Sequence, residues 1–211
     1  MAARAMTKPR ATPPDGYHIR AATVEDLRGV RACLLEAFEP YRPSYTAKAF
    51  TDTVPSGPAL EDRRRRMSLL VAVDGAGKVL GTVASRAGPE GVGHLRGMAV
   101  RRDWQGTGVA RAILDRALKD LRSRGCRRAT LETTIPLARA ARFYAKNGFR
   151  RSGRVSDFFG MPLIEYVREL DGVPNEGPRS SVPPRAPGAA GGLRRRTASS
   201  RELRRARRPA A

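Results

Sequence analysis

The sequence lacks the features that would place the chain in a membrane, in an oxidising compartment or around a metal ion. No run approaches the roughly 18 to 20 uncharged apolar residues that a membrane-spanning helix needs. The N-terminal segment has no apolar core of the kind that a secretory signal carries. Only two cysteines occur, Cys33 and Cys126, and their spacing matches neither a metal site nor a redox motif. We therefore expect a cytoplasmic protein with two reduced, buried cysteines, no bound metal and no membrane contact.

Acidic residues are scarce relative to basic ones, and the imbalance extends along the whole chain. The 211 residues include 20 Asp and Glu against 41 Lys and Arg, which gives a formal net charge of +21. Residues 171–211 carry +7 of this charge, and residues 17–170 carry +12. Such a surplus predicts a polyanionic partner, and both a nucleic acid and a phosphorylated cofactor have that chemistry.

The two ends of the chain contain too few large apolar side chains to build a core. Residues 1–16 and the tail of residues 171–211, which is rich in Pro, Gly, Ser and Arg, are therefore predicted to be disordered. The charge of the tail favours weak contact with nucleic acid. The remaining residues, 17–170, are predicted to form one folded domain.

Within that domain, hydrophobic periodicity predicts alternating strands and helices. Period-two patterns predict strands over 17–21, 68–73, 79–84, 94–100, 128–133, 149–155 and 163–170. Helical spacing predicts one helix capped by Thr23, one over 107–123 and one opened by Pro136, with one or two short helices within 40–66. The order β-α-α-β-β-β-α-β-α-β-β indicates an α/β fold in which helices cover a mixed sheet.

A loop between a predicted strand and a predicted helix carries the strongest functional pattern. The strand ends with Met98, Ala99 and Val100, and the segment that follows contains Gln105, Gly106, Thr107, Gly108, Val109 and Ala110. Its glycines let the main chain approach a ligand closely. The first N–H groups of a helix lack partners and attract negative charge. The segment is therefore predicted to bind a pyrophosphate group, with added positive charge from Arg101, Arg102 and Arg111.

Two blocks of residues share their pattern and their order with a known family. The first is Gln105-x-x-Gly108-x-Ala110, between a strand and a helix. The second is Ala140-x-x-Phe143-Tyr144-Ala-Lys-Asn-Gly148-Phe149, where a helix leads into a strand. Together they resemble the GNAT superfamily of acyl-CoA-dependent N-acetyltransferases, and the resemblance covers about residues 17–170.

The resemblance implies a three-layer GNAT-like domain that transfers an acetyl group from acetyl-CoA to a primary amine within a ternary complex. In this family the loop binds the pyrophosphate of the cofactor through main-chain N–H groups, here those of residues 105–110. The strand end at 98–100 contacts the pantetheine arm and polarises the acetyl carbonyl. A tyrosine protonates the departing thiolate, and the matching residue is Tyr144. Periodicity alone would instead make Tyr144 a half-buried core residue.

The general base, the acceptor and the oligomeric state stay open at this stage. Many family members have a carboxylate on the strand that ends at Val100, and this sequence has none there. His94 on that strand and Glu132 on the next are the two candidates, although an amine that arrives unprotonated needs neither. The acceptor, a small molecule or a protein amine, is expected to contact residues 36–66 and 153–161. Both a monomer and a homodimer are compatible with the sequence.

The run Arg63–Arg66 is the densest charge inside the domain, and it has three interpretations. It can be a solvated helix end, a contact for the distal phosphate of the cofactor, or a contact for an acidic substrate. The general surplus of arginine also leaves a second function open. In that alternative, a non-catalytic binding protein with a GNAT fold docks nucleic acid or ribosomes through its basic tail.

Overall fold

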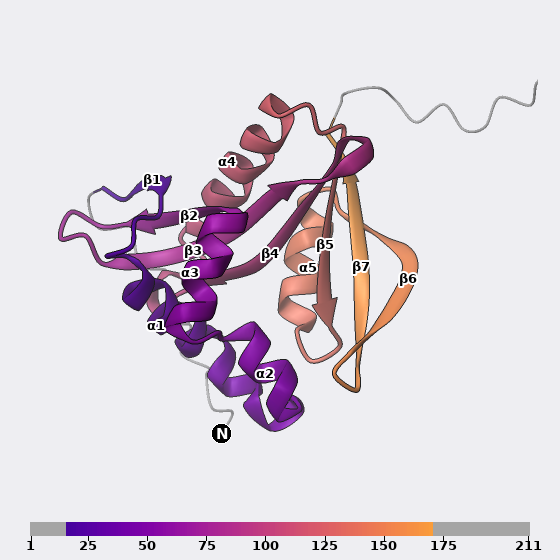
Figure 1. The fold of residues 1–211 in the computed structure, drawn as a ribbon, viewed down its shortest axis with the longest axis horizontal. Helices are drawn as coiled ribbons and strands as arrows, with labels where there is room; N and C mark the ends of the chain where they lie inside the picture. Colours follow the sequence, from indigo (N-terminus) through magenta and orange to yellow (C-terminus); the bar gives the residue numbers. More distant parts are fainter. Residues whose placement is uncertain (1–15, 171–211) are drawn as a thin grey trace, which may run out of the picture. The chain divides into compact units, whose positions relative to one another are not determined.

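The computed structural model describes residues 16–170, and a mixed seven-stranded sheet runs through them (Figure 1). The order of the strands across the sheet is β1-β2-β3-β4-β5-β7-β6, with β4 and β5 parallel and all other neighbours antiparallel. The strands are β1 (His18–Ala21), β2 (Ser68–Val73), β3 (Val79–Ala87), β4 (Val92–Val100), β5 (Arg128–Thr134), β6 (Arg150–Phe158) and β7 (Met161–Glu169).

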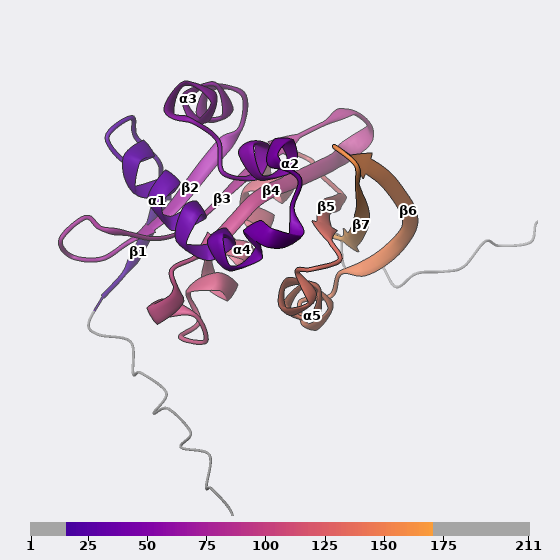
Figure 2. The same ribbon diagram turned by 90° about the horizontal axis from the view of Figure 1, so that it is seen from below.

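Helices cover both faces of the sheet, which confirms the expected three-layer α/β architecture. One face carries α1 (Leu27–Phe38), α2 (Ala47–Thr53) and α3 (Gly57–Arg66), and the other carries α4 (Val109–Ser123) and α5 (Ala138–Lys146) (Figure 2). The predicted order had one helix fewer between the first two strands, where α2 and α3 are separate helices. In the part of the chain that the structure describes, no helix has the length and apolarity needed to cross a membrane.

The continuous apolar run of β2 explains how one sheet supports two cores. Successive side chains of a strand point to opposite faces. Accordingly Leu70 and Ala72 belong to the core beneath α4, and Leu69, Val71 and Val73 belong to the core beneath α1 and α3. A strand buried on both sides needs apolar residues at every position, and this one is Ser-Leu-Leu-Val-Ala-Val. The two cysteines are also buried, as expected.

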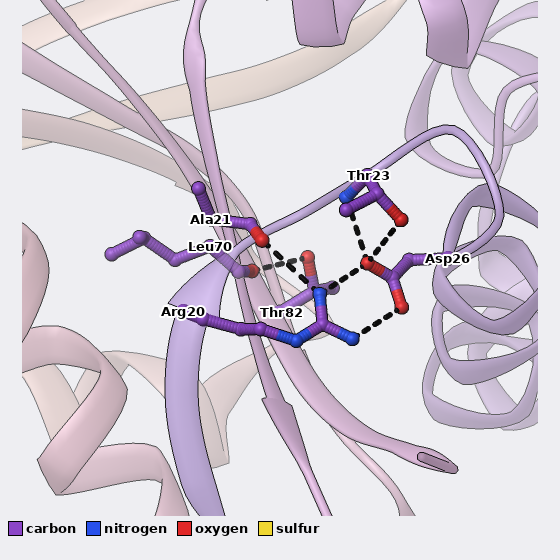
Figure 3. A network of polar contacts seen from close by, with 6 residues as sticks. All are labelled: Arg20, Ala21, Thr23, Asp26, Leu70 and Thr82. Atoms are coloured by element: carbon purple, nitrogen blue, oxygen red, sulfur yellow. Dashed lines mark hydrogen bonds and ion pairs between the residues drawn. The ribbon is translucent and has the colours of Figure 1, made fainter.

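The beginning of α1 is tied to β1 by an ion pair in which Asp26 is buried and Arg20 is partly exposed (Figure 3). Both carboxylate oxygens of Asp26, which is 7% exposed, accept bonds from Arg20 at 2.5 and 3.0 Å. The main-chain N–H and the hydroxyl of Thr23 also donate to Asp26, at 2.7 and 3.1 Å. Arg20 therefore holds the pKa of Asp26 below its ordinary value, helped by the bonds from Thr23 and opposed by burial. Thr23 was predicted to cap the helix, but the residue before the first turn is Asp26.

Two helix starts lie later than the sequence pattern predicted. Helix α4 begins at Val109 and not near Thr107, because Gly106 and Gly108 have positive φ angles of +88° and +100° that a helix does not accommodate. Helix α5 begins at Ala138, two residues after Pro136. The predictions of disorder for residues 1–16 and 171–211 concern segments that lie almost wholly outside the described residues.

The parallel strands β4 and β5 are paired over a short length only, and this leaves an opening between them. Strands β4 and β5 pair only where Val92–Leu95 face Arg128–Leu131, and beyond that point they diverge (Figure 1). The register of β4 against β3 also shifts by one residue near Gly97, which has a φ of +62°. Such a bulge increases the local twist of a strand. The opening that results lies in front of the loop that leads into α4.

Candidate active site

The loop between β4 and α4 presents a row of main-chain N–H groups without partners. A Cβ at Gly106 or Gly108 would meet no protein atom within 4 Å. Ala112 donates to the Gly108 carbonyl at 3.0 Å, so the N–H groups that precede it have no place in the helical ladder. Among the described residues, no acceptor is bonded by the N–H groups of Gly106, Gly108, Val109, Ala110 and Arg111. An anion of the size of a pyrophosphate matches this arrangement of donors.

The main-chain N–H of Gln105 is not one of the free donors, although the motif predicted that it would be. Its N–H donates to the Arg102 carbonyl at 3.2 Å, and its side-chain Nε2 donates to the Val100 carbonyl at 3.0 Å. Arg139 on α5 donates to its Oε1 at 2.7 Å. Gln105 therefore links β4, the loop and α5, and the free donors begin one residue later. Thr107 also bonds within the loop, since its hydroxyl donates to the Trp104 carbonyl at 2.8 Å.

The arginines near the loop do not all face it. Arg101 was expected to add positive charge there, but its Nη1 lies 2.6 Å from Glu36 Oε2 and its Nε donates to the Val79 carbonyl at 2.7 Å. This correction has a simple cause, because a half-buried guanidinium takes the nearest carboxylate. Arg111 and Arg139 line the cavity beside the loop. The sequence pattern did not single out Arg139, since an arginine on an exposed helical face carries no distinctive signal.

A cavity of about 380 Å³ follows the opening between β4 and β5. Its walls include the predicted strand end, Met98, Ala99 and Val100, and loop residues Gln105, Gly106, Gly108 and Ala110, but not Thr107 or Val109. Arg101 donates to Leu80 on β3 at 2.8 Å. Because neighbouring residues of a strand direct their main-chain groups to opposite edges, Val100 faces the opening. The main chain of β4 is therefore accessible to a ligand along this edge.

Tyr144 lines the same cavity, from α5. Its ring is 9% exposed and packs edge-on against Phe143 and Phe149, with centroid distances of 5.5 and 5.8 Å. Within the described residues its hydroxyl forms no hydrogen bond. Burial raises the pKa of the Tyr144 phenol, so the group keeps its proton at neutral pH. Tyr144 is thus both a core residue and a proton-bearing group at the cavity wall.

A second cavity, of about 340 Å³, lies on the other side of the opening and shares a wall with the first. Glu132 lines both cavities, whereas His94 lines only the second of these two. His94 Nε2 lies 3.9 Å from Glu132 Oε2, and its Nδ1 lies 3.2 Å from the Thr130 hydroxyl. Burial lowers the pKa of His94, although Glu132 opposes this effect. The two candidate bases therefore sit side by side, with Glu132 nearer the first cavity.

Aromatic side chains form much of the remaining wall of the second cavity, from Phe38, Tyr45, Phe158 and Phe159. The Tyr45 hydroxyl lies 2.7 Å from that of Thr134, which ties the segment before α2 to the end of β5. The Thr46 hydroxyl donates to the Phe159 carbonyl at 2.9 Å and joins α2 to the turn between β6 and β7. Phe159 is 48% exposed and has a φ of +52°, which is rare for an aromatic residue. Residues from both expected acceptor segments thus meet here.

Thr133 on β5 is a site residue that the sequence did not reveal. It is 4% exposed, lines both cavities, and its buried hydroxyl has no hydrogen-bond partner among the described residues. A buried polar atom without a partner is costly, and such atoms point to a ligand or to function. A threonine in an alternating strand pattern carries no signal of this kind, so only the tertiary structure identifies it.

Comparison with known proteins gives relatives that act on amines. The chain is 28% identical to N-alpha-acetyltransferase MAK3 of Arabidopsis thaliana over 86 residues, which are 39% of this chain and 45% of that protein. It is 36% identical to the aminoglycoside N(6')-acetyltransferase type 1 of Stenotrophomonas maltophilia over 72 residues, 34% of this chain and 46% of that protein. The matched region thus spans about half the length of these curated relatives.

Solved structures and a family model extend the comparison over more than half of the chain. The PaiA N-acetyltransferase of Thermoplasma acidophilum, solved in complex with coenzyme A, superimposes with a TM-score of 0.61 at 18% identity. The alignment covers 73% of this chain and 99% of that one, and it shows a common fold. The model of the acetyltransferase (GNAT) family matches residues 30–149, which is more than half of the sequence. The chain belongs to the GNAT family of acetyltransferases.

Proposed function

We propose that this protein transfers an acetyl group from acetyl-CoA to a primary amine by direct attack within a ternary complex. The observation that carries the proposal is the shared wall of the two cavities. One cavity joins the loop donors, the β4 main chain and Tyr144, and the other opens on the opposite side at Glu132. The two curated relatives named above are both N-acetyltransferases, which supports an amine as the acceptor.

The residues of the first cavity fit acetyl-CoA. The free N–H groups between Gly106 and Arg111 suit its pyrophosphate, and the β4 edge suits an extended pantetheine arm. The unpartnered Thr133 hydroxyl supplies a further polar contact in the wall that the two cavities share. When bound, acetyl-CoA supplies an activated acetyl group as a thioester. The Val100 N–H, which faces the opening, is the donor that we assign to the acetyl carbonyl oxygen.

Tyr144 is assigned as the general acid for the departing thiolate. A thiol has a pKa of about 8.5 and a tyrosine of about 10, so a proton transfer from phenol to a nascent alkyl thiolate is feasible when the two are aligned. Burial raises the pKa of Tyr144 further and makes the phenol a weaker acid, but the same burial makes a thiolate that forms beside it a stronger base, so the proton transfer stays feasible. The absence of a competing acceptor among the described residues leaves the hydroxyl available for this bond.

Glu132 is the residue that we favour as the proton acceptor for the amine. It lies where the two cavities meet, whereas His94 does not reach the first cavity. His94 then has a positioning role, because its Nε2 lies 3.9 Å from the Glu132 carboxylate. The lowered pKa of His94 keeps the imidazole neutral at pH 7, so the pair does not depend on a buried imidazolium.

Two measurements test the proposal in sequence. Coenzyme A should raise the melting temperature, since a ligand that binds only the folded state stabilises it by mass action. Release of free thiol from acetyl-CoA in the presence of a panel of primary amines then tests catalysis. No thermal shift at millimolar coenzyme A would contradict the proposal. A shift without thiol release on any amine would favour the non-catalytic alternative.

A further inference from the structure

Arg63 differs from the other arginines of its run. Arg64 pairs with Glu61 at 2.9 Å, Arg66 pairs with Asp62 at 3.0 Å, and Arg65 is exposed. The Arg63 side chain instead extends to α2, where its Nη2 donates to the Asp52 carbonyl at 3.0 Å.

Arg63 reaches the bulge of β4. Its Nη1 lies 3.0 Å from the position that a Cβ would occupy at Gly97, so the missing side chain of Gly97 makes room for the guanidinium. Arg63 thereby becomes part of the wall of the second cavity, the one on the α1–α3 side of the opening.

The positive charge of Arg63 has no carboxylate partner within the described residues. The Asp52 carboxylate is already bound by Arg96, with Nη2 and Oδ2 2.6 Å apart. Burial and the neighbouring Arg96 lower the pKa of Arg63 to about 10, although Asp52 opposes this effect, so the group is still charged at neutral pH. Two guanidinium groups thus lie near one carboxylate, and only that of Arg96 is paired with it. A half-buried cation in this position is stabilised by any anion that enters the cavity.

The surplus of positive charge continues into a neighbouring groove of about 790 Å³. Five residues line both this groove and the second cavity: Asp52, Arg63, His94, Arg96 and Phe159. The groove adds Lys48 and Arg86, both exposed and without a carboxylate within 4.0 Å among the described residues. Arg86 stands opposite His94 in the β3–β4 pairing. Glu132 therefore lines the second cavity but not the groove, whereas Lys48 and Arg86 line the groove but not the second cavity.

We infer that the acceptor is an amine that also carries an anionic group, a carboxylate or a phosphate, which binds at Arg63 with Lys48 and Arg86 beside it. The inference rests on the proposed function and specifies its substrate class. The amine end of such a molecule lies toward Glu132, and its anionic end lies toward the groove. Arg63 lines the second cavity and the groove but not the cavity at the loop, so this charge does not serve the phosphates of the cofactor.

Matched pairs of substrates test the charge preference directly. We would compare ω-amino carboxylates of increasing length with their terminal amides, and phosphoethanolamine with ethanolamine, by thiol release at saturating acetyl-CoA. The wild type should prefer the anionic member of at least one pair. Arg63→Gln should reduce that preference by about 10- to 100-fold, the usual size of a charge-assisted hydrogen bond. Its kcat/KM should fall by a much smaller factor on the neutral member than on the anionic member.

Further variants separate this role from a loss of folding. Arg65→Gln changes an exposed arginine of the same helix that lines none of these cavities, and it should leave the preference unchanged. Arg63→Lys should keep part of the preference for the anionic substrate. Arg86→Gln should weaken this preference, and because Arg86 is exposed, the substitution does not alter a buried side chain. A wild type without any preference for anionic amines would overturn the inference. A preference that survives both Arg63→Gln and Arg86→Gln would also overturn it.

A binding measurement distinguishes this failure from failure of the proposed function. With coenzyme A saturating the loop, inorganic phosphate or glutarate is titrated into the protein by calorimetry. Binding that is lost in Arg63→Gln and retained in Arg65→Gln supports the anion site even if no amine is acetylated. Absence of binding in the wild type, together with acetylation of neutral amines alone, would refute the anion site and leave the acetyltransferase activity standing.

Discussion

Replacement of Tyr144 by phenylalanine should remove most of the turnover and almost none of the stability. The ring packs edge-on against Phe143 and Phe149, and phenylalanine keeps these contacts. The hydroxyl has no hydrogen-bond partner among the described residues, so its removal breaks no intramolecular bond. We therefore expect a change of less than about 1 kcal/mol in the free energy of unfolding.

The expected effect on catalysis is much larger. A positioned general acid contributes about 10²- to 10⁴-fold to the rate, which corresponds to about 2.7 to 5.5 kcal/mol of activation free energy. The loss should appear in kcat, with little change in the affinity for coenzyme A, because the hydroxyl acts on the thiolate that forms in the transition state.

Tyr166 offers a matched control in the same core. It is 5% exposed, lines none of the cavities described above, and its hydroxyl accepts a bond from Arg151 Nε at 3.2 Å. Tyr166→Phe should therefore lower the free energy of unfolding by about 1 kcal/mol and leave kcat unchanged. Steady-state thiol release and thermal melts on both variants check the two patterns. A Tyr144→Phe enzyme with more than half of the wild-type turnover, on an acceptor for which chemistry is rate-limiting, would refute the assignment.

Three further predictions follow from the same geometry. Gly108→Val and Gly153→Val place a side chain at φ angles of +100° and +92°. Both should cost about 1 to 3 kcal/mol of stability, but calorimetry should show lost coenzyme A binding only for Gly108→Val. Glu132→Gln should lower kcat/KM on a protonated amine more than His94→Asn does. The measurement is kcat/KM as a function of pH for both variants, and equal losses of kcat/KM in the two variants would contradict Glu132 as the base. Asp26→Asn should destabilise the fold by about 2 to 3 kcal/mol at pH 7. Because the pKa of Asp26 is lowered in the folded state, its contribution is present above the unfolded value near 3.8 and is lost as the pH falls below it. Thermal melts from pH 7 to pH 3 should therefore be flatter for Asp26→Asn than for the wild type.

The elements that the sequence predicted well are those whose signal is local. The strand Ser68–Val73 has the predicted bounds, and Ile113, Leu114, Ala117 and Leu118 of α4 are buried along the predicted stripe. Alternation and helical spacing depend only on which neighbours share a face, so a short window of sequence is sufficient. The start of α4 was placed two residues early, because the pattern does not show that Gly106 and Gly108 have positive φ angles.

The partners of the charged and polar side chains could not be read in the same way. Arg101 was expected at the loop, and it pairs instead with Glu36, a residue 65 positions away. Thr133 and Thr134 are adjacent on β5, yet within residues 16–170 only the Thr134 hydroxyl meets a partner, Tyr45. Such pairings depend on which segments the fold brings together, and the periodicity of a single element has no information about them.

The sequence by itself determined the family and the order of most elements, because each is written in short local patterns. Gln105, Gly108 and Ala110, followed downstream by Tyr144, were sufficient to indicate the GNAT family. The tertiary structure decided how these parts combine. It opened the sheet between β4 and β5, and it placed Glu132 at the junction of the two cavities. It also turned one arginine of a uniform run, Arg63, toward the second cavity, where its guanidinium occupies the space beside Gly97.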